Sequence, residues 1–134
     1  FVTTIKYLCK FVIMTDKTKN LLQWIAAGLV GAIFVMSGIM KFNLPPDMVE
    51  KMASQGITPT IAKTLAVIEI LSAILFLIPR TAVLGTLLLA AYMGGAIAVH
   101  LTTGQDITAP CVTQAIIWIV AVWRNPELKT RLLG

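Results

Sequence analysis

The chain has 134 residues, of which 57% are hydrophobic and 13% are charged, and its formal net charge is +5. Soluble domains usually contain about 45–50% apolar and about 25% charged residues, and a domain this short could not bury so much apolar surface in water. The basic residues lie at the termini and between apolar segments, without a basic stripe interleaved with aromatic residues, which disfavours nucleic acid as a partner. Composition therefore predicts a single integral membrane domain in contact with the lipid bilayer.

Residues 1–20 are expected to form a cytoplasmic segment before the first span. The stretch MTDKTKN, which starts at Met14, is typical of a natural start, so we expect residues 1–13 to lie upstream of the native protein. A signal peptide is the alternative, but no small-residue cleavage site precedes Met14. We therefore draw no functional prediction from residues 1–13.

Four apolar stretches follow, at residues 21–42, 61–78, 81–101 and 107–123. A transmembrane helix needs about 20 apolar residues, with a range of roughly 17–25. Because lipid offers no water to open backbone groups, helices are favoured over isolated strands. The pattern predicts an all-α fold, an integral membrane four-helix bundle over residues 21–124 with a basic cytoplasmic tail at 125–134.

The connection between the first two apolar stretches contains an amphipathic segment. Residues 47–54 follow a Pro-Pro pair, and Met48, Val49 and Met52 would share one helical face. This spacing predicts a short interfacial helix in the first outer loop, packed on the bundle.

Basic residues set the expected orientation. With a cytoplasmic N-terminus, three basic residues fall outside: Lys41, Lys51 and Lys63. Eight fall inside: Lys6, Lys10, Lys17, Lys19, Arg80, Arg124, Lys129 and Arg131. The positive-inside rule then predicts that both termini are cytoplasmic.

Small residues recur in the first and third stretches at spacings that let helix backbones approach closely in lipid. The glycines expected at such contacts are Gly28, Gly31, Gly38, Gly94 and Gly95. Helix packing accounts for them without a ligand, and the same faces are compatible with a homo-oligomer.

The apolar run AVIEILSAILF carries one carboxylate, Glu69, near its centre. A charge inside a membrane is costly, so it needs a partner or a function. At about 1.5 Å per helical residue, Glu69 lies about 12 Å below the outer end of its helix. We predict that Glu69 faces the bundle interior in a polar pocket with Lys41, Ser37, Tyr92 and His100. The alternative is a hydrogen-bonding strut without turnover.

No metal site is predicted, because His100 is the only histidine and Cys9 and Cys111 form no CxxC pair. A single histidine also disfavours a bis-histidine haem within one copy of the chain. No motif for flavin, haem, iron–sulfur or dithiol chemistry is present. Any electrons would therefore come from a partner.

Three segments carry a family resemblance: SGIMKF at 37–42, the long stretch at 67–104, and WRNPELKTR at 123–131. In this order, with a Gly-x-x-Lys, a Glu in the second helix, a third helix ending in His, and a basic tail, they resemble the DoxX-like family of small bacterial membrane proteins. The resemblance covers about residues 24–131 and implies a four-helix bundle in the bacterial cytoplasmic (inner) membrane. The positions that match the family pattern are Gly38, Lys41, Glu69, Arg80, Gly94, Gly95 and His100.

Some relatives in this family are similar to a subunit of thiosulfate:quinone oxidoreductase, and others are linked with oxidative-stress systems. The resemblance thus favours a redox-linked or quinone-associated accessory subunit, with a quinone as candidate ligand and a membrane or peripheral oxidoreductase as candidate partner. We do not expect the chain to be an enzyme on its own. The alternatives are a non-catalytic scaffold or assembly subunit, and a small proton-coupled transporter with Glu69 as the exchanging acid.

Overall fold

The structure is a computed structural model that describes residues 1–5 and 16–134. All regular secondary structure in these ranges is helical. The helices are α2 (Asp16–Met40), α3 (Pro46–Ser54), α4 (Pro59–Leu77), α5 (Ala82–Thr102), α6 (Thr108–Arg124) and α7 (Pro126–Leu133). The predicted all-α fold is confirmed.

Three of these helices, α2, α4 and α5, are long and apolar enough to cross a membrane. α6 is also apolar, but its 17 residues place it at the lower end of the roughly 17–25 residues that a span requires. Large apolar side chains remain exposed on the outer faces, among them Ile33 at 63%, Leu71 at 55% and Ile119 at 66%. Because a row of such side chains is disfavoured in water, the protein is a membrane protein whose helices contact lipid.

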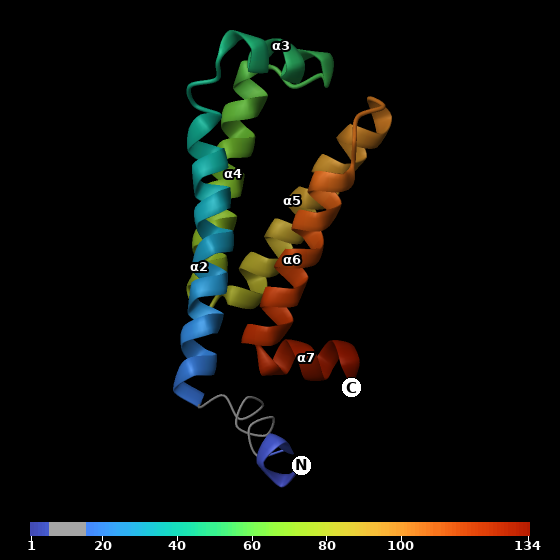
Figure 1. Cartoon of the computed structure of the whole chain (residues 1–134). Coiled ribbons are helices and arrows are strands. Elements are labelled where there is room, and N and C mark those ends of the chain that lie inside the picture. The colour runs from blue at the N-terminus through green and yellow to red at the C-terminus, as the bar shows by residue number, and fades with distance from the viewer. Residues whose placement is uncertain (6–15) are drawn as a thin grey trace.

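The helices form two antiparallel pairs, α2 with α4 and α5 with α6, joined by contacts between α4 and α5 (Figure 1). Contacts between α2 and α6 close the bundle at the end that carries α7, which we call the α7 end. The two pairs diverge toward the other end, where α3 lies across the top of α2 and α4 (Figure 1). We call this the α3 end. Both α2 and α7 therefore begin at the same end of the molecule.

The apolar core fills the half of the bundle nearer the α7 end. Its fully buried members come from all four bundle helices: Ala27, Ala73, Phe76, Leu89, Ile117 and Ala121. α7 adds Leu128 to this core, which fixes its position against α6. The half nearer the α3 end holds less apolar packing and the buried carboxylate Glu69.

The α4–α5 connection is tight because a glycine permits a close approach. A Cβ atom at Gly85 would collide with the backbone of Phe76, so no larger residue fits without a backbone shift. Thr81 adds a hydrogen bond from its hydroxyl to the carbonyl oxygen of Leu75, at 2.9 Å. These contacts hold the end of α4 against the start of α5.

Arg124 joins three helices at the α7 end. Its guanidinium donates to the carbonyl oxygens of Phe76 at 2.7 Å and Leu77 at 2.6 Å. These are among the last carbonyls of α4, which have no partner within their own helix. The same guanidinium lies 4.6 Å from the centroid of the Trp24 ring on α2. A cation therefore caps the negative end of the α4 dipole and stacks on an aromatic face.

The helix bounds differ from the predicted ones at the two ends of the chain. α2 begins at Asp16, before the predicted start at 21, and most of the predicted basic tail is the helix α7. Pro126 in the first turn, followed by Glu127, is a helix-start signal that explains α7. The prediction for residues 1–13 falls largely on residues 6–15, which lie outside the described residues.

Candidate functional site

The Glu69 carboxylate accepts hydrogen bonds from two side chains outside its own helix. The Nζ atom of Lys41, just after the end of α2, lies 2.6 Å from Glu69 Oε2. The hydroxyl of Tyr92 on α5 donates to the same oxygen at 3.1 Å. Lys41 also donates to the Ser37 hydroxyl at 2.7 Å. The structure thus brings Ser37, Lys41, Glu69 and Tyr92 into one polar cluster.

Burial makes this pairing energetically important. The Glu69 side chain is 2% exposed and that of Lys41 is 13% exposed. Removing a carboxylate from water has a desolvation penalty of roughly several kcal/mol. Only good ion-pair and hydrogen-bond geometry offsets this penalty. The Lys41 ammonium and the Tyr92 hydroxyl supply that geometry from α2 and α5. The cluster therefore ties three helices together near the α3 end.

Apolar residues separate this cluster from the α7 end. The ring of Phe34 packs edge-on against Tyr92, with ring centroids 6.4 Å apart. Ser72, one turn below Glu69, donates its hydroxyl to the Ile68 carbonyl of its own helix. The polar side chains available to a ligand therefore lie above this level, toward the α3 end.

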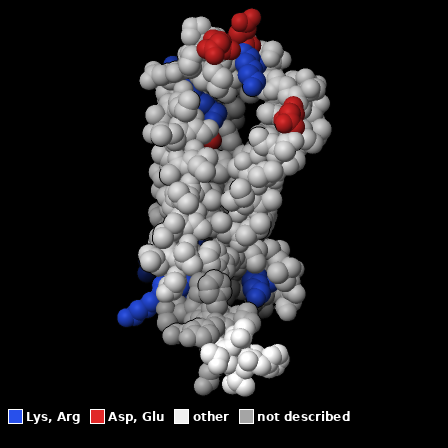
Figure 2. Space-filling model, in the orientation of Figure 1, with Lys and Arg blue, Asp and Glu red and all other residues white. Residues whose placement is uncertain are grey.

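A pocket of about 450 Å³ opens beside the cluster, between α4 and α5. Its polar lining includes Lys41, Tyr92 and His100, and its apolar walls include Leu65 and Val99. Figure 2 shows the surface hollowed near the α3 end, between the two helix pairs. Small-molecule sites commonly have about 300–1,000 Å³, mostly apolar walls and a few convergent polar groups. This pocket has those properties.

A pair of glutamines is hydrogen-bonded beside the pocket. Gln55, which lines the pocket just after α3, donates from Nε2 to Oε1 of Gln105 at 2.7 Å. Gln105 lies in the α5–α6 loop, so the bond joins the two diverging helix pairs. Sequence reasoning did not identify Gln55; its place directly after an amphipathic helix is the only signal that points to it.

His100 lines the same pocket but does not contact Glu69 by a hydrogen bond. Its Nδ1 atom lies 2.7 Å from the carbonyl oxygen of Asp106. A carbonyl oxygen can only accept, so Nδ1 carries the proton, and in the neutral ring Nε2 is an acceptor. Among the described residues no group bonds to Nε2.

The Asp106 carboxylate is held by the start of α6. Its Oδ1 atom accepts from the Thr108 hydroxyl at 2.6 Å and from the Thr108 backbone N–H at 2.9 Å. These bonds stabilise the charged form and hold the pKa of the exposed Asp106 carboxyl below its ordinary value. The loop that positions the His100 ring is thereby fixed to α6.

The predicted packing glycines separate into two groups. A Cβ at Gly31 would meet the Leu77 side chain at 2.8 Å, and one at Gly38 would meet the Ala66 carbonyl oxygen at 3.2 Å. Both lie at the α2–α4 contact. The remaining glycines have no atom within 4 Å of an added Cβ: Gly28, Gly94 and Gly95. Packing within one copy of the chain does not account for them, and Gly95 lines the pocket.

Two structural residues escaped the sequence-based predictions. Gly85 permits the close α4–α5 approach, and Arg124, assigned only to the cytoplasmic side, caps α4. Gln114 on α6 also buries its Oε1 atom without a hydrogen-bond partner among the described residues. Within residues 1–5 and 16–134, no group of three His, Cys, Asp or Glu side chains lies close enough together to hold a metal ion.

Comparison with curated proteins and with solved structures found no match. The sequence profile of the DoxX-like family matches residues 25–123. This range contains the polar cluster, the pocket, all of α4 and α5, and most of α2 and α6. The resemblance carried by the sequence motifs is confirmed, and the chain belongs to the DoxX-like family.

Proposed function

We propose that this protein is a quinone-associated accessory subunit of a membrane redox system. The observation that carries the proposal is the pocket of about 450 Å³ that places Lys41, Tyr92 and His100 on apolar walls beside a buried carboxylate. A quinone head group is a small ring with two oxygens that accept hydrogen bonds. The Lys41 ammonium has three N–H donors: two are taken by the side chains of Glu69 and Ser37, and the third, whose bond to the Ser37 carbonyl oxygen is long at 3.4 Å, can turn to a quinone oxygen. The single O–H of Tyr92 is donated to Glu69, so the Tyr92 oxygen, like His100 Nε2, can accept from the hydroxyl of a quinol.

The position of the pocket suits a ligand that arrives through lipid. Ile68, which lines the pocket, is 45% exposed, so the pocket opens on the apolar surface of α4. An apolar tail could therefore remain in the bilayer while the head group occupies the pocket. A purely aqueous ligand would gain nothing from this lateral opening.

The hydrogen-bonded groups support a route for protons in this proposal. Conversion of a quinone to a quinol takes up two electrons and two protons. The electrons would come from a partner oxidoreductase in or on the membrane. The two protons would come from water at the open α3 end: one would be relayed through Tyr92, which is bonded to Glu69 at 3.1 Å, and the other through His100. The chain would thus bind the ligand and move protons, without performing electron transfer itself.

Orientation follows from the basic residues of the described chain. Three lie at the α3 end: Lys41, Lys51 and Lys63. Six lie at the α7 end: Lys17, Lys19, Arg80, Arg124, Lys129 and Arg131. The positive-inside rule favours a cytoplasmic α7 end, with the pocket toward the outer face of the bacterial cytoplasmic membrane. Reporter fusions after Gly104 and Arg131 should then report opposite sides.

Filling the pocket tests the proposal. Gly95 lines the pocket and Gly94 does not, although both have open space for a side chain. We expect the wild-type protein in nanodiscs to bind a short-chain quinone saturably. Gly95→Leu should bind it at least about tenfold more weakly, which is equivalent to about 1.4 kcal/mol. Gly94→Leu, the matched control, should bind it with wild-type affinity. Equal binding by Gly95→Leu would exclude this pocket.

The same measurements separate the alternatives. A scaffold or assembly subunit predicts no saturable quinone binding by the wild-type protein. A proton-coupled transporter predicts substrate-driven proton movement in liposomes that requires Glu69, with or without quinone.

A further inference from the structure

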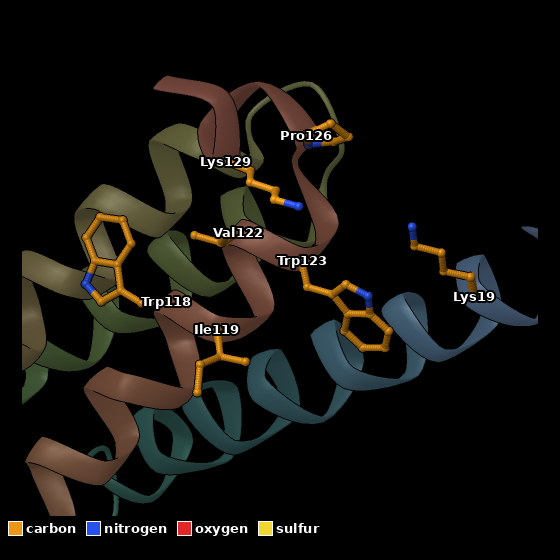
Figure 3. A pocket seen from close by; sticks show the side chains of 7 residues that line it. All are labelled: Lys19, Trp118, Ile119, Val122, Trp123, Pro126 and Lys129. Carbon is orange, nitrogen blue, oxygen red and sulfur yellow. The ribbon is translucent and has the colours of Figure 1, made fainter. Parts of the chain in front are cut away.

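A second concave surface lies at the α7 end, far from the pocket described above. It is a groove of about 600 Å³ bordered by α2, α6 and α7. Trp118, Ile119 and Trp123 of α6 form its wall, and Lys19 of α2 and Lys129 of α7 lie at its edge (Figure 3). Lys129 and Lys19 extend from opposite sides toward the space beside the Trp123 ring (Figure 3).

The groove has an unbalanced positive charge. Within residues 1–5 and 16–134 neither Lys19 nor Lys129 forms a salt bridge. The acidic residues at this end, Asp16 and Glu127, do not line the groove. Arg124 is occupied by the α4 carbonyls and Trp24. Two ammonium groups are therefore available to one anion.

The position of α7 indicates how deep this groove lies in the membrane. α7 turns away from the axis of α6 and runs across the direction of the bundle, outward from α2 (Figure 1). It buries Leu128 and exposes Lys129 and Arg131, as an interfacial helix does. Ile119, which is 66% exposed, lies more than one helical turn before the end of α6 at Arg124, and therefore nearer the membrane centre than α7. The ammonium groups are thus at headgroup depth and the apolar wall is at acyl-chain depth.

We propose that this groove binds one anionic phospholipid. The phosphate lies between Lys19 and Lys129, and an acyl chain follows Ile119 and Val122 along α6. Tryptophans suit this position because indole prefers the membrane interface. Basic pockets at the cytoplasmic ends of membrane helices bind anionic headgroups in this way. Free phosphate would satisfy the lysines but would leave the apolar wall unused.

Tryptophan fluorescence tests this site directly. All three tryptophans of the chain lie at the α7 end, and Trp118 and Trp123 line the groove. The full chain is placed in phosphatidylcholine nanodiscs that contain increasing fractions of brominated phosphatidylglycerol, and quenching is recorded. We expect saturation at a low fraction of the anionic lipid, and much weaker quenching by brominated phosphatidylcholine at the same fraction.

Matched variants identify the binding groups. A basic residue near an anionic surface changes affinity about fivefold, so Lys19→Gln/Lys129→Gln should raise the half-saturating fraction about thirtyfold. Lys19→Arg/Lys129→Arg should retain wild-type binding. Lys51→Gln/Lys63→Gln, which removes two cations at the α3 end, should also leave it unchanged. The single glutamine variants should each show about a fivefold effect, which serves as the test if the double variant does not fold.

Three results would overturn the proposal. The first is equal quenching by the anionic and zwitterionic brominated lipids. The second is unchanged half-saturation in Lys19→Gln, Lys129→Gln and the double variant. The third is relief of quenching by inorganic phosphate but not by chloride at the same ionic strength, which would assign the site to a free anion.

Discussion

Lys41 and Glu69, 28 residues apart in the sequence, meet with an Nζ–Oε2 distance of 2.6 Å. This contact joins the end of α2 to the middle of α4, and Tyr92 extends it to α5. Because Glu69 is almost fully buried, the ion pair fixes how three helices meet at the α3 end. The pocket takes two of its polar side chains, Lys41 and Tyr92, from the same network.

Breaking this ion pair should destabilise the protein, and removing both charges should destabilise it less. Glu69→Gln leaves Lys41 without its counter-ion; loss of one partner of a buried pair costs about 3–5 kcal/mol, an upper bound here because Lys41 is partly exposed. Lys41→Met in the Glu69→Gln background should restore part of the loss. A double-mutant cycle of unfolding free energies in detergent measures the coupling. Purely additive effects would contradict an energetic role for the pair.

Gly85→Ala should lower the unfolding free energy by about 1–3 kcal/mol, because the added Cβ collides with the Phe76 backbone. Gly94→Ala on the same helix is the matched control. Its Cβ meets open space, so alanine should be neutral or stabilise the helix by up to about 1 kcal/mol. Thermal unfolding of both variants measures the difference. Equal stability of the two would show that α4 and α5 are not closely packed at Gly85.

Arg124→Gln should destabilise the α7 end, because two carbonyls at the end of α4 lose a charged donor. Hydrogen bonds to charged groups contribute about 1.5–3 kcal/mol, which sets the expected loss. Arg131→Gln, which changes an exposed cation on α7, is the control and should have little effect. Hydrogen exchange at the α4–α5 connection locates the change. Unaltered protection there in Arg124→Gln would argue against the capping role.

Thr108→Val should raise the pKa of the Asp106 carboxyl toward its ordinary value, because the hydroxyl bond is its largest stabilising contact. In the wild-type protein the lowered pKa means that this contact stabilises the fold at pH above the ordinary carboxyl value. That contribution is lost as the pH falls through the lowered pKa. Carboxyl-carbon NMR titration measures the shift, with Thr113→Val as control. An unchanged Asp106 pKa in Thr108→Val would show that the Thr108 hydroxyl does not cause the lowered pKa.

The four bundle helices were predictable because the length of an apolar run is a strong signal in a membrane chain. The end of α2 near Lys41 and the position of α3 both followed from local patterns. The helical tail was not predicted because its short amphipathic pattern gives a weak signal until Leu128 finds the core. Its Asn-Pro-Glu start was nevertheless visible in the sequence.

Part of the site was predictable for a different reason. Glu69 is conspicuous in an apolar run, and a shared level in the bundle suggested Lys41 and Tyr92 as neighbours. The partner of His100, a backbone carbonyl in the α5–α6 loop, depends on loop geometry that residue identity does not encode. The Gln55–Gln105 contact depends on how far the helix pairs diverge, which is a property of packing across the whole bundle.

A photoreactive quinone analogue tests most directly whether the pocket beside Lys41, Tyr92 and His100 binds a quinone head group. The analogue is crosslinked to the full chain in nanodiscs, and the modified residues are identified by mass spectrometry, with and without excess unlabelled quinone. We expect labelling at Lys41 and on the pocket-facing turns of α5 between Tyr92 and His100, and we expect excess unlabelled quinone to reduce it. Labelling that excess quinone does not reduce, or that falls only on lipid-facing residues such as Leu71, would contradict it.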